Sequence, residues 1–246
     1  MSDAPILVPP GFRIIAHRGA SGYAPENTLA AFRLAESMGA RDIEFDLQLT
    51  QDGEMVIVHD GVLDRYGYPG VRVAETTLAA LRALDMAAWF GDARYRGERM
   101  PTADELFAAF GRRFFYHAEI KAPSPRLARD LAGLLERLGF GDNAVVTSFD
   151  FDILVEYRRL APAQPVGWLV RDGGFTVENV ARAAAAGFRQ FCPRAGDVTA
   201  AKVAAAKSRV QEVRAHGVRT RDDARRAVEA GCDGMTINWP DWLAVR

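Results

Sequence analysis

A regular alternation of apolar, strand-like runs with helical stretches constrains the fold of this sequence more than any other feature. Strands are expected at residues 12–16, 43–49, 114–120, 144–149, 165–170, 188–192, 209–215 and 234–237, and each is followed by a helical stretch. Eight such units in 246 residues are typical of an α/β fold of the (β/α)8 type, a TIM barrel. A doubly wound sheet is the second candidate, but no GxGxxG motif follows the first strand.

The stretch at residues 61–101 interrupts this alternation after the second strand. It is too long for a simple loop and carries only one short predicted helix, at 77–84. The sequence T102-x-x-E105 then opens the next helix as a capping box. Pro123 and Pro125 are expected to end the third strand. We therefore expect one domain over residues 1–246, with an insertion at about 61–101.

Composition excludes several classes of function. The formal net charge is −1 and no basic stripe is present, which argues against nucleic acid and anionic membranes as partners. No apolar run is long enough to span a bilayer, so no stable membrane insertion is expected, and the first residues lack the charged and apolar regions of a signal peptide. A cytoplasmic protein is expected. Cys192 and Cys232 lie in separate apolar runs without CxxC spacing, which indicates buried free thiols.

Polar residues collect where the first two strands end. His17 and Arg18 directly follow the first strand, and Glu44 and Asp46 alternate with apolar residues along the second. Alternation with a period of two places both carboxylates on one face. The Asp-Gly pair at 52–53 predicts a hairpin that sets residue 46 opposite residue 58, so His59 is expected to return beside the two carboxylates.

The third strand ends in Glu119 and Lys121, which share a face because they are two residues apart. Strand ends of a parallel barrel meet at one mouth, so a third carboxylate is expected beside Glu44 and Asp46. Three clustered carboxylates repel one another unless a proton or a cation lies among them. Oxygen ligands of this kind favour a hard divalent cation, Mg²⁺ or Ca²⁺.

Arg18 and Lys121 add fixed positive charges to the same mouth. Cations beside a metal site indicate that an anion binds there too, and phosphate is the simplest one that bridges them. The chain has only three lysines, so Lys121 is unlike an arbitrary solubilising charge. Histidines on either side of a bound phosphate provide a general base and a general acid. We call the seven residues His17, Arg18, Glu44, Asp46, His59, Glu119 and Lys121 the rim residues.

Several motifs resemble the glycerophosphodiester phosphodiesterase family, a group of phospholipase C-like barrels: HRGASGYAPENTLAAF, EFDLQLTQDGEMVIVHD, LRALD, WF, GERMPT and AEIK. The resemblance implies a (β/α)8 barrel, a divalent metal, and hydrolysis of glycerophosphodiesters to glycerol 3-phosphate and an alcohol. It implies acid–base roles for His17 and His59, metal ligation by Glu44, Asp46 and Glu119, and phosphate contacts from Arg18 and Lys121. It also implies that the insertion caps the mouth of the barrel.

The chain departs from the family pattern at four places. It reads LDRYGYPG around Tyr66, LDMA around Met86, RAHGVR around His216, and INWP around Asn238. We expect none of these departures to touch the rim residues. All four are expected near the alcohol part of the substrate, which leaves the identity of the alcohol open.

Two other readings remain possible on the sequence. One is a related barrel phospholipase, of the phosphatidylinositol-specific or sphingomyelinase D type, which needs an exposed apolar or basic edge. Its only candidates here are Tyr66, Tyr68, Trp89 and Phe90. The other is a non-catalytic barrel that binds a phosphorylated ligand, although no rim residue is missing. The sequence leaves open the metal, the oligomeric state, and which histidine is the acid.

Overall fold

Eight parallel strands close into a barrel in the computed structural model, which describes residues 4–121 and 124–246. The order of pairing around the barrel is β2-β10-β9-β8-β7-β6-β5-β3, and β2 also pairs with β3 and closes it. The strands are β2 (Arg13–His17), β3 (Asp42–Leu49), β5 (Phe115–Ile120), β6 (Ala144–Ser148), β7 (Val166–Leu169), β8 (Gln190–Cys192), β9 (Glu212–Val218) and β10 (Gly234–Ile237). The (β/α)8 prediction is confirmed.

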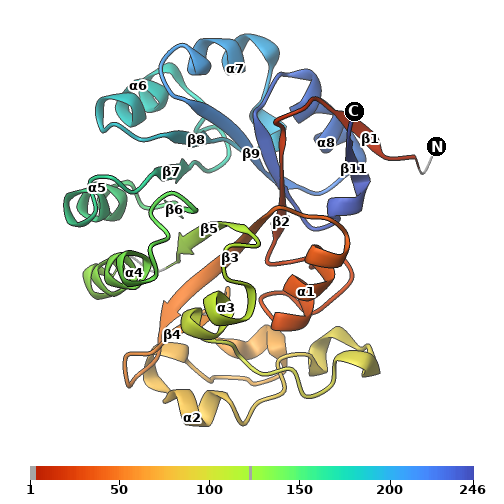
Figure 1. Cartoon of the computed structure of the whole chain (residues 1–246), viewed down its shortest axis with the longest axis vertical. Helices are drawn as coiled ribbons and strands as arrows, with labels where there is room; N and C mark the ends of the chain where they lie inside the picture. The colour runs from red at the N-terminus through yellow and green to blue at the C-terminus, as the bar shows by residue number, and fades with distance from the viewer. Residues whose placement is uncertain (1–3, 122–123) are drawn as a thin grey trace.

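The helices lie around the outside of these strands (Figure 1). They are α1 (Leu29–Ser37), α2 (Leu78–Leu81), α3 (Ala103–Phe110), α4 (Pro125–Leu138), α5 (Phe151–Leu160), α6 (Val177–Ala185), α7 (Ala200–Lys207) and α8 (Arg221–Glu229). Each begins at a Ser, Thr or Asp whose side chain accepts a hydrogen bond from a backbone N–H of the first turn. The predicted capping box of α3 is present. Pro125 opens α4, whereas Pro123 lies outside the described residues.

Strand β3 shows how the sequence separates the two sides of the barrel wall. Ile43, Phe45 and Leu47 are fully buried. Phe45 packs edge-on against Phe32 of α1 and Phe107 of α3, so the apolar face points out to the helices. Burying an aromatic side chain of this kind stabilises the fold by roughly 1.5–3 kcal/mol. The opposite face, which carries Glu44 and Asp46, therefore points into the barrel.

The predicted hairpin after β3 is confirmed. Strand β4 (Met55–Ile57) pairs antiparallel with β3, and Gly53 has a φ of 86°, a left-handed conformation that glycine adopts without strain. Val58 N donates to Asp46 O at 3.0 Å, which is the predicted register. His59 therefore returns to the end of β3.

The insertion forms a small layer of its own beside this hairpin, at the lower end of the view (Figure 1). It contains α2 and four 3-10 turns, η1 (Leu63–Tyr66), η2 (Val73–Glu75), η3 (Ala88–Phe90) and η4 (Ala93–Tyr95). Helix α2 is shorter than the predicted 77–84. The layer buries a separate apolar cluster of Val56, Val58, Leu63, Tyr66, Val73, Leu81, Met86 and Met100.

A second, two-stranded parallel sheet joins the ends of the chain and was not predicted. Strand β1 (Ile6–Val8) pairs with β11 (Leu243–Val245), after the 3-10 turn η6 (Pro240–Trp242), so the described ends lie side by side (Figure 1). Three-residue runs are below the length at which alternation distinguishes a strand from a loop. The helical stretch expected after the last strand, at 234–237, is this single 3-10 turn.

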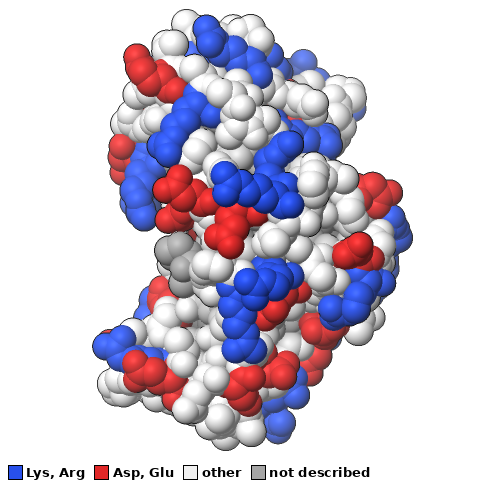
Figure 2. Space-filling view, turned by 90° about the vertical axis from the view of Figure 1, so that its left-hand side faces the viewer, with Lys and Arg blue, Asp and Glu red and all other residues white. Residues whose placement is uncertain are grey.

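Charges of both signs are interspersed over the face shown in Figure 2. No strongly basic field covers that face, in line with the net charge of −1. Among the described residues, no helix has the length and apolar character that crossing a bilayer requires. Cys192 and Cys232 are both buried and unpaired, as predicted.

Candidate active site

A cavity of about 560 Å³ opens at the carboxyl ends of the barrel strands. Six of the seven rim residues line it: His17, Arg18, Glu44, His59, Glu119 and Lys121. Asp46 is fully buried beneath them. Parallel pairing of β2, β3 and β5 aligns the strand ends, because Glu44 is in register with His17 and Asp46 with Glu119. The structure therefore brings together every side chain that the sequence predicted to meet.

The three carboxylates form a compact, buried acidic cluster. One oxygen from each of Glu44, Asp46 and Glu119 lies within 4.8 Å of the others. Burial, followed by repulsion from Asp46 and Glu119, raises the pKa of Glu44 well above its usual range. Burial and Asp46 likewise raise the pKa of Glu119 to about 7. The surrounding protein groups therefore do not fully compensate the charge of Glu44 and Glu119.

The donor set suits a divalent cation. Glu44 Oε1 and Asp46 Oδ1 are buried without a hydrogen-bond partner, which is costly unless another group satisfies them. Oxygen donors of this kind are the ligands that Mg²⁺ and Ca²⁺ prefer. The residues present thus fit the metal that the acidic cluster predicts.

Two cations flank the acidic cluster. Lys121 Nζ lies 3.0 Å from Glu119 Oε1 and 3.6 Å from Asp46 Oδ1. Arg18 Nε lies 3.0 Å from Asp46 Oδ2, and its Nη1 donates to both oxygens of Glu26 at 2.9 and 3.0 Å. Burial alone raises the pKa of Asp46, but Arg18 and Lys121 outweigh it and hold that pKa at about 2. Asp46 is therefore the member of the acidic cluster that ionises most readily.

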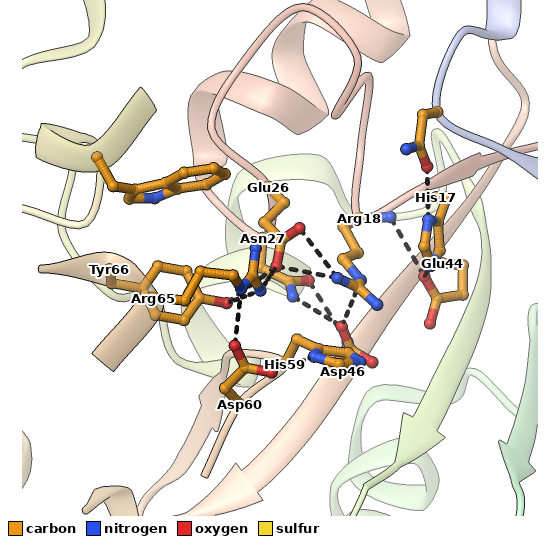
Figure 3. A network of polar contacts seen from close by, with 12 residues as sticks. His17, Arg18, Glu26, Asn27, Glu44, Asp46, His59, Asp60, Arg65 and Tyr66 are labelled. Atoms are coloured by element: carbon orange, nitrogen blue, oxygen red, sulfur yellow. Dashed lines mark hydrogen bonds and ion pairs between the residues drawn. The ribbon is translucent and has the colours of Figure 1, made fainter. Parts of the chain in front are cut away.

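The backbone at the end of β2 is held in an uncommon conformation. Arg18 and Asn27 have φ values of 55° and 59°, and they are the only described non-glycine residues with positive φ. Arg18 N donates to Glu44 O at 2.8 Å, while Asn27 N donates to Arg18 O at 3.0 Å. Strain of this kind persists where surrounding bonds impose it. Here it aims the Arg18 side chain at Asp46 (Figure 3).

The two histidines have different partners. His17 Nδ1 is 2.6 Å from Asn238 Oδ1, and its Nε2 is 3.8 Å from Glu44 Oε2. With Asn238 Oδ1 as acceptor, Nδ1 carries the proton and Nε2 faces the acidic cluster with its lone pair. His59 Nδ1 is instead 2.5 Å from Asp60 Oδ1. Burial lowers the pKa of both rings, and for His17 the Arg18 charge lowers it further.

The contact at Asn238 corrects one expectation. The departures from the family pattern were expected not to touch the rim residues, but Asn238 hydrogen-bonds His17 directly. Strand β10 ends at Ile237 and pairs with β2. This pairing places the next residue, Asn238, beside the His17 side chain. Asn238 therefore orients a rim residue.

The other departures divide into two groups. His216 lines the cavity, as expected for a residue near the alcohol. Tyr66 and Met86 do not line it, because both are buried in the apolar cluster of the insertion. The expectation that they contact the alcohol is wrong for the cavity as it stands. No residue of the insertion lines the cavity among those described.

Three functional residues were missed by the sequence reasoning: Glu26, Asn27 and Asn238. Asn27 Nδ2 donates to Asp46 Oδ2 at 2.8 Å. Glu26 accepts from Arg18, from Arg65 Nη2 at 2.6 Å and from the Tyr66 hydroxyl at 2.9 Å, so it connects the insertion to the rim (Figure 3). The signal for the first two was the PENT motif, in which Asn27 or Thr28 was expected to cap the next helix and no residue was expected to support the rim; Thr28 is the cap.

Comparisons with known proteins identify the family to which this chain belongs. Residues 17–242 match the model of the glycerophosphoryl diester phosphodiesterase family. A glycerophosphodiester phosphodiesterase of Bacillus subtilis is 31% identical over 98% of this chain and 88% of its own. A glycerophosphodiester phosphodiesterase of Caldanaerobacter subterraneus subsp. tengcongensis is 32% identical over 94% of this chain and 95% of its own.

A solved structure also superimposes on this barrel. It is a phosphodiesterase of Oleispira antarctica, in complex with the product sn-glycerol-3-phosphate. The two structures share 26% identity with a TM-score of 0.82, over 95% of this chain and 94% of the other. With the match of the family model over almost the whole chain, these findings show that the protein belongs to the glycerophosphoryl diester phosphodiesterase family.

Proposed function

We propose that this protein hydrolyses glycerophosphodiesters to glycerol 3-phosphate and an alcohol, with a divalent metal as cofactor. The observation that carries the proposal is the buried cluster of Glu44, Asp46 and Glu119, flanked by two cations and two histidines in one cavity. Family membership supports the reaction class. The product bound to the Oleispira antarctica enzyme is the product that this reaction would release.

Glu44, Asp46 and Glu119 would hold the metal, and their oxygens favour Mg²⁺ or Ca²⁺. A metal bound there would neutralise charge on the phosphate oxygens. Arg18 and Lys121 would contact the same phosphate and stabilise the additional negative charge of the transition state. Arg18 is already oriented by Glu26 and Asp46, so this guanidinium needs little reorganisation during the reaction.

The two histidines would divide the proton transfers. A base takes a proton from the attacking water as its oxygen bonds to phosphorus, and an acid gives a proton to the alcohol oxygen as its bond to phosphorus breaks. His17 suits the base, because Asn238 holds its Nδ1 and leaves Nε2 facing the acidic cluster. His59 suits the acid, because Asp60 accepts from its Nδ1 and stabilises the protonated ring. One domain would carry the whole reaction.

The test is an assay of glycerophosphodiester hydrolysis in which both products are measured. Purified protein with Mg²⁺ or Ca²⁺ is expected to release glycerol 3-phosphate and the free alcohol in equal amounts. Release of diacylglycerol, or of ceramide phosphate, from liposomes without hydrolysis of the soluble diester would favour a barrel phospholipase instead. Absence of turnover on every diester would favour a ligand-binding barrel.

Replacing Lys121 with Met is expected to lower kcat/KM. The expected loss of transition-state stabilisation is about 2–4 kcal/mol, which is typical of one electrostatic donor to a transition state. Lys121 Nζ is the donor because it lies beside Glu119 and Asp46 at the cavity wall. The melting temperature should change little. Kinetics and thermal melting of Lys121→Met check this. Intact turnover with a large loss of stability would instead make Lys121 a structural ion-pair partner.

A further inference from the structure

The half of the cavity away from the acidic cluster is rich in arginine. Arg171, Arg194 and Arg219 follow the ends of β7, β8 and β9, and Arg214 lies within β9; all four line this part. The proposed reaction does not use any of them. Among the residues that the structure describes, Asp172 is the only carboxylate that lines the same part, and it pairs with Arg194 Nε at 2.8 Å. We call these four arginines the arginine subsite.

Arg214 is the informative member of the arginine subsite. It is one of the largest fully buried side chains, with 2% of its surface exposed. Its Nη1 donates to Thr236 Oγ1, but Nε and Nη2 are buried without a hydrogen-bond partner. No carboxylate lies within ion-pair distance of it in the described part of the chain. A buried, unpaired guanidinium is costly, and an anion in the cavity would satisfy it.

The other members add charge at the cavity wall. Arg171 and Arg219 are exposed, and neither forms an ion pair with a described residue. Nearby, His216 Nε2 donates to Val170 O at 2.9 Å, and burial lowers the pKa of His216 to about 4. The ring is thus neutral at pH 7. The net charge of this part of the cavity is positive and comes from arginines.

Phe149 lies close both to Lys121 and to Arg171 of the arginine subsite. The Lys121 Nζ lies 5.8 Å from the centroid of the Phe149 ring, and the Arg171 Cζ lies 5.1 Å from the same centroid. A single aromatic ring thus separates a proposed phosphate contact from the arginine subsite. A short alcohol attached to the reacting phosphate reaches that far.

We propose that the arginine subsite binds a second phosphate, carried by the alcohol part of the substrate. This inference rests on the proposed function and specifies its substrate class: glycerophosphodiesters whose alcohol is itself phosphorylated. Arg214 would bind the second phosphate through Nε and Nη2, which are adjacent donors of the kind that pairs with two phosphate oxygens. Water splits the bond between the reacting phosphorus and the alcohol oxygen, so the phosphorylated alcohol is released with its own phosphate intact.

A cationic alcohol such as choline suits this cavity poorly. Quaternary ammonium groups are recognised by the faces of aromatic rings. Apart from the histidines, Phe149 is the only aromatic residue in the described part of the chain that lines the cavity, and two cations already lie within 6 Å of its centroid. Repulsion from the arginines would add to the lack of a free ring.

The test compares three substrates that share the glycerol 3-phosphate half. Their alcohols are glycerol, glycerol phosphate and choline, which are neutral, anionic and cationic. We expect kcat/KM for the phosphorylated alcohol to exceed that for glycerol by about 10- to 100-fold, the gain typical of charged hydrogen bonds. Choline should be the poorest of the three. Hydrolysis of all three at similar kcat/KM would overturn the inference and leave the proposed function standing.

Variants assign the preference to the arginine subsite. Arg214→Met is expected to remove most of the preference through a rise in KM for the phosphorylated substrate. Arg171→Gln lies at the exposed edge of the cavity, so it tests the same preference if Arg214→Met does not fold. Arg225→Met is the matched control, because Arg225 lies on α8 and pairs with Asp222 away from the cavity. A preference that survives in Arg171→Gln and in folded Arg214→Met would overturn the inference.

A binding measurement separates the inference from the proposed function. In EDTA, sulfate should raise the melting temperature of the wild type above that in sodium chloride of equal ionic strength. Arg225→Met should show the same increase and Arg171→Gln a smaller one. Equal increases in all three proteins would show an adventitious ion only and would overturn the inference. Lack of hydrolysis of every diester, by contrast, would overturn the proposed function.

Discussion

Excess EDTA is expected to abolish hydrolysis of glycerophosphodiesters by this protein, and Mg²⁺ or Ca²⁺ should restore it. The physical reason is the cluster of Glu44, Asp46 and Glu119, whose oxygens lie within 4.8 Å of one another and of which Glu44 Oε1 and Asp46 Oδ1 have no hydrogen-bond partner. A divalent cation supplies several kcal/mol of charge stabilisation at phosphorus, so its removal should reduce the rate by about 10³-fold or more. Initial rates measured during titration with each metal check this.

Glu44→Gln tests which residues hold the metal. The variant should bind metal more weakly in a calorimetric titration, while the metal-free protein should melt no lower than the wild type, because burial and the neighbouring carboxylates already disfavour a charge at Glu44. Glu229→Gln is the control, since Glu229 is exposed on α8 far along the chain from the acidic cluster. Full activity in excess EDTA, or unchanged metal affinity in Glu44→Gln, would contradict the metal site.

Removing either histidine is expected to reduce turnover of a natural glycerophosphodiester by about 10²- to 10⁴-fold, the range typical of general acid–base catalysis. The two variants should differ on a p-nitrophenyl diester, whose leaving group departs without a proton. His59→Ala should lose much less on that substrate, because the acid is dispensable there. His17→Ala should lose about the same factor on both substrates, because both need the base.

For His59→Ala the comparison across two substrates is its own control for folding, since a misfolded variant would lose activity on both alike. Added imidazole should partly restore His17→Ala, as expected for a missing proton acceptor and not for a collapsed cavity. If both variants lose one and the same factor on both substrates, the division of roles is wrong. One histidine would then orient the other or attack phosphorus itself.

Local sequence patterns were sufficient to predict most of the barrel. The alternation in β3 predicted which residues face the helices and which face the cavity, because the period of two is a property of any extended chain. The Asp-Gly hairpin predicted the return of His59, because turn type determines register. Strand ends in a parallel barrel share one mouth, so the meeting of Glu44, Asp46 and Glu119 followed from topology alone.

Weak or ambiguous local signals limited the rest of the fold. Strands β1 and β11 have three residues each and pair only with each other, so neither shows a period that can be recognised. The helix expected at 77–84 was too long by one residue at its start and three at its end, because element boundaries depend on packing in the insertion.

Tertiary structure alone decided which residues support the rim and what surrounds it. Asn238 orients His17 across 221 residues of chain, and Tyr66 reaches Glu26 across 40. Neither contact can be predicted from a local period or a turn, because its two residues are far apart in the sequence. The sequence determined that carboxylates, cations and histidines would share one barrel mouth. That Arg214 is buried with two unpaired donors depends on the closed barrel. A charge that is solvated in the unfolded chain becomes an unpaired donor when folding removes its water, and only the folded structure shows which polar groups are left without a partner.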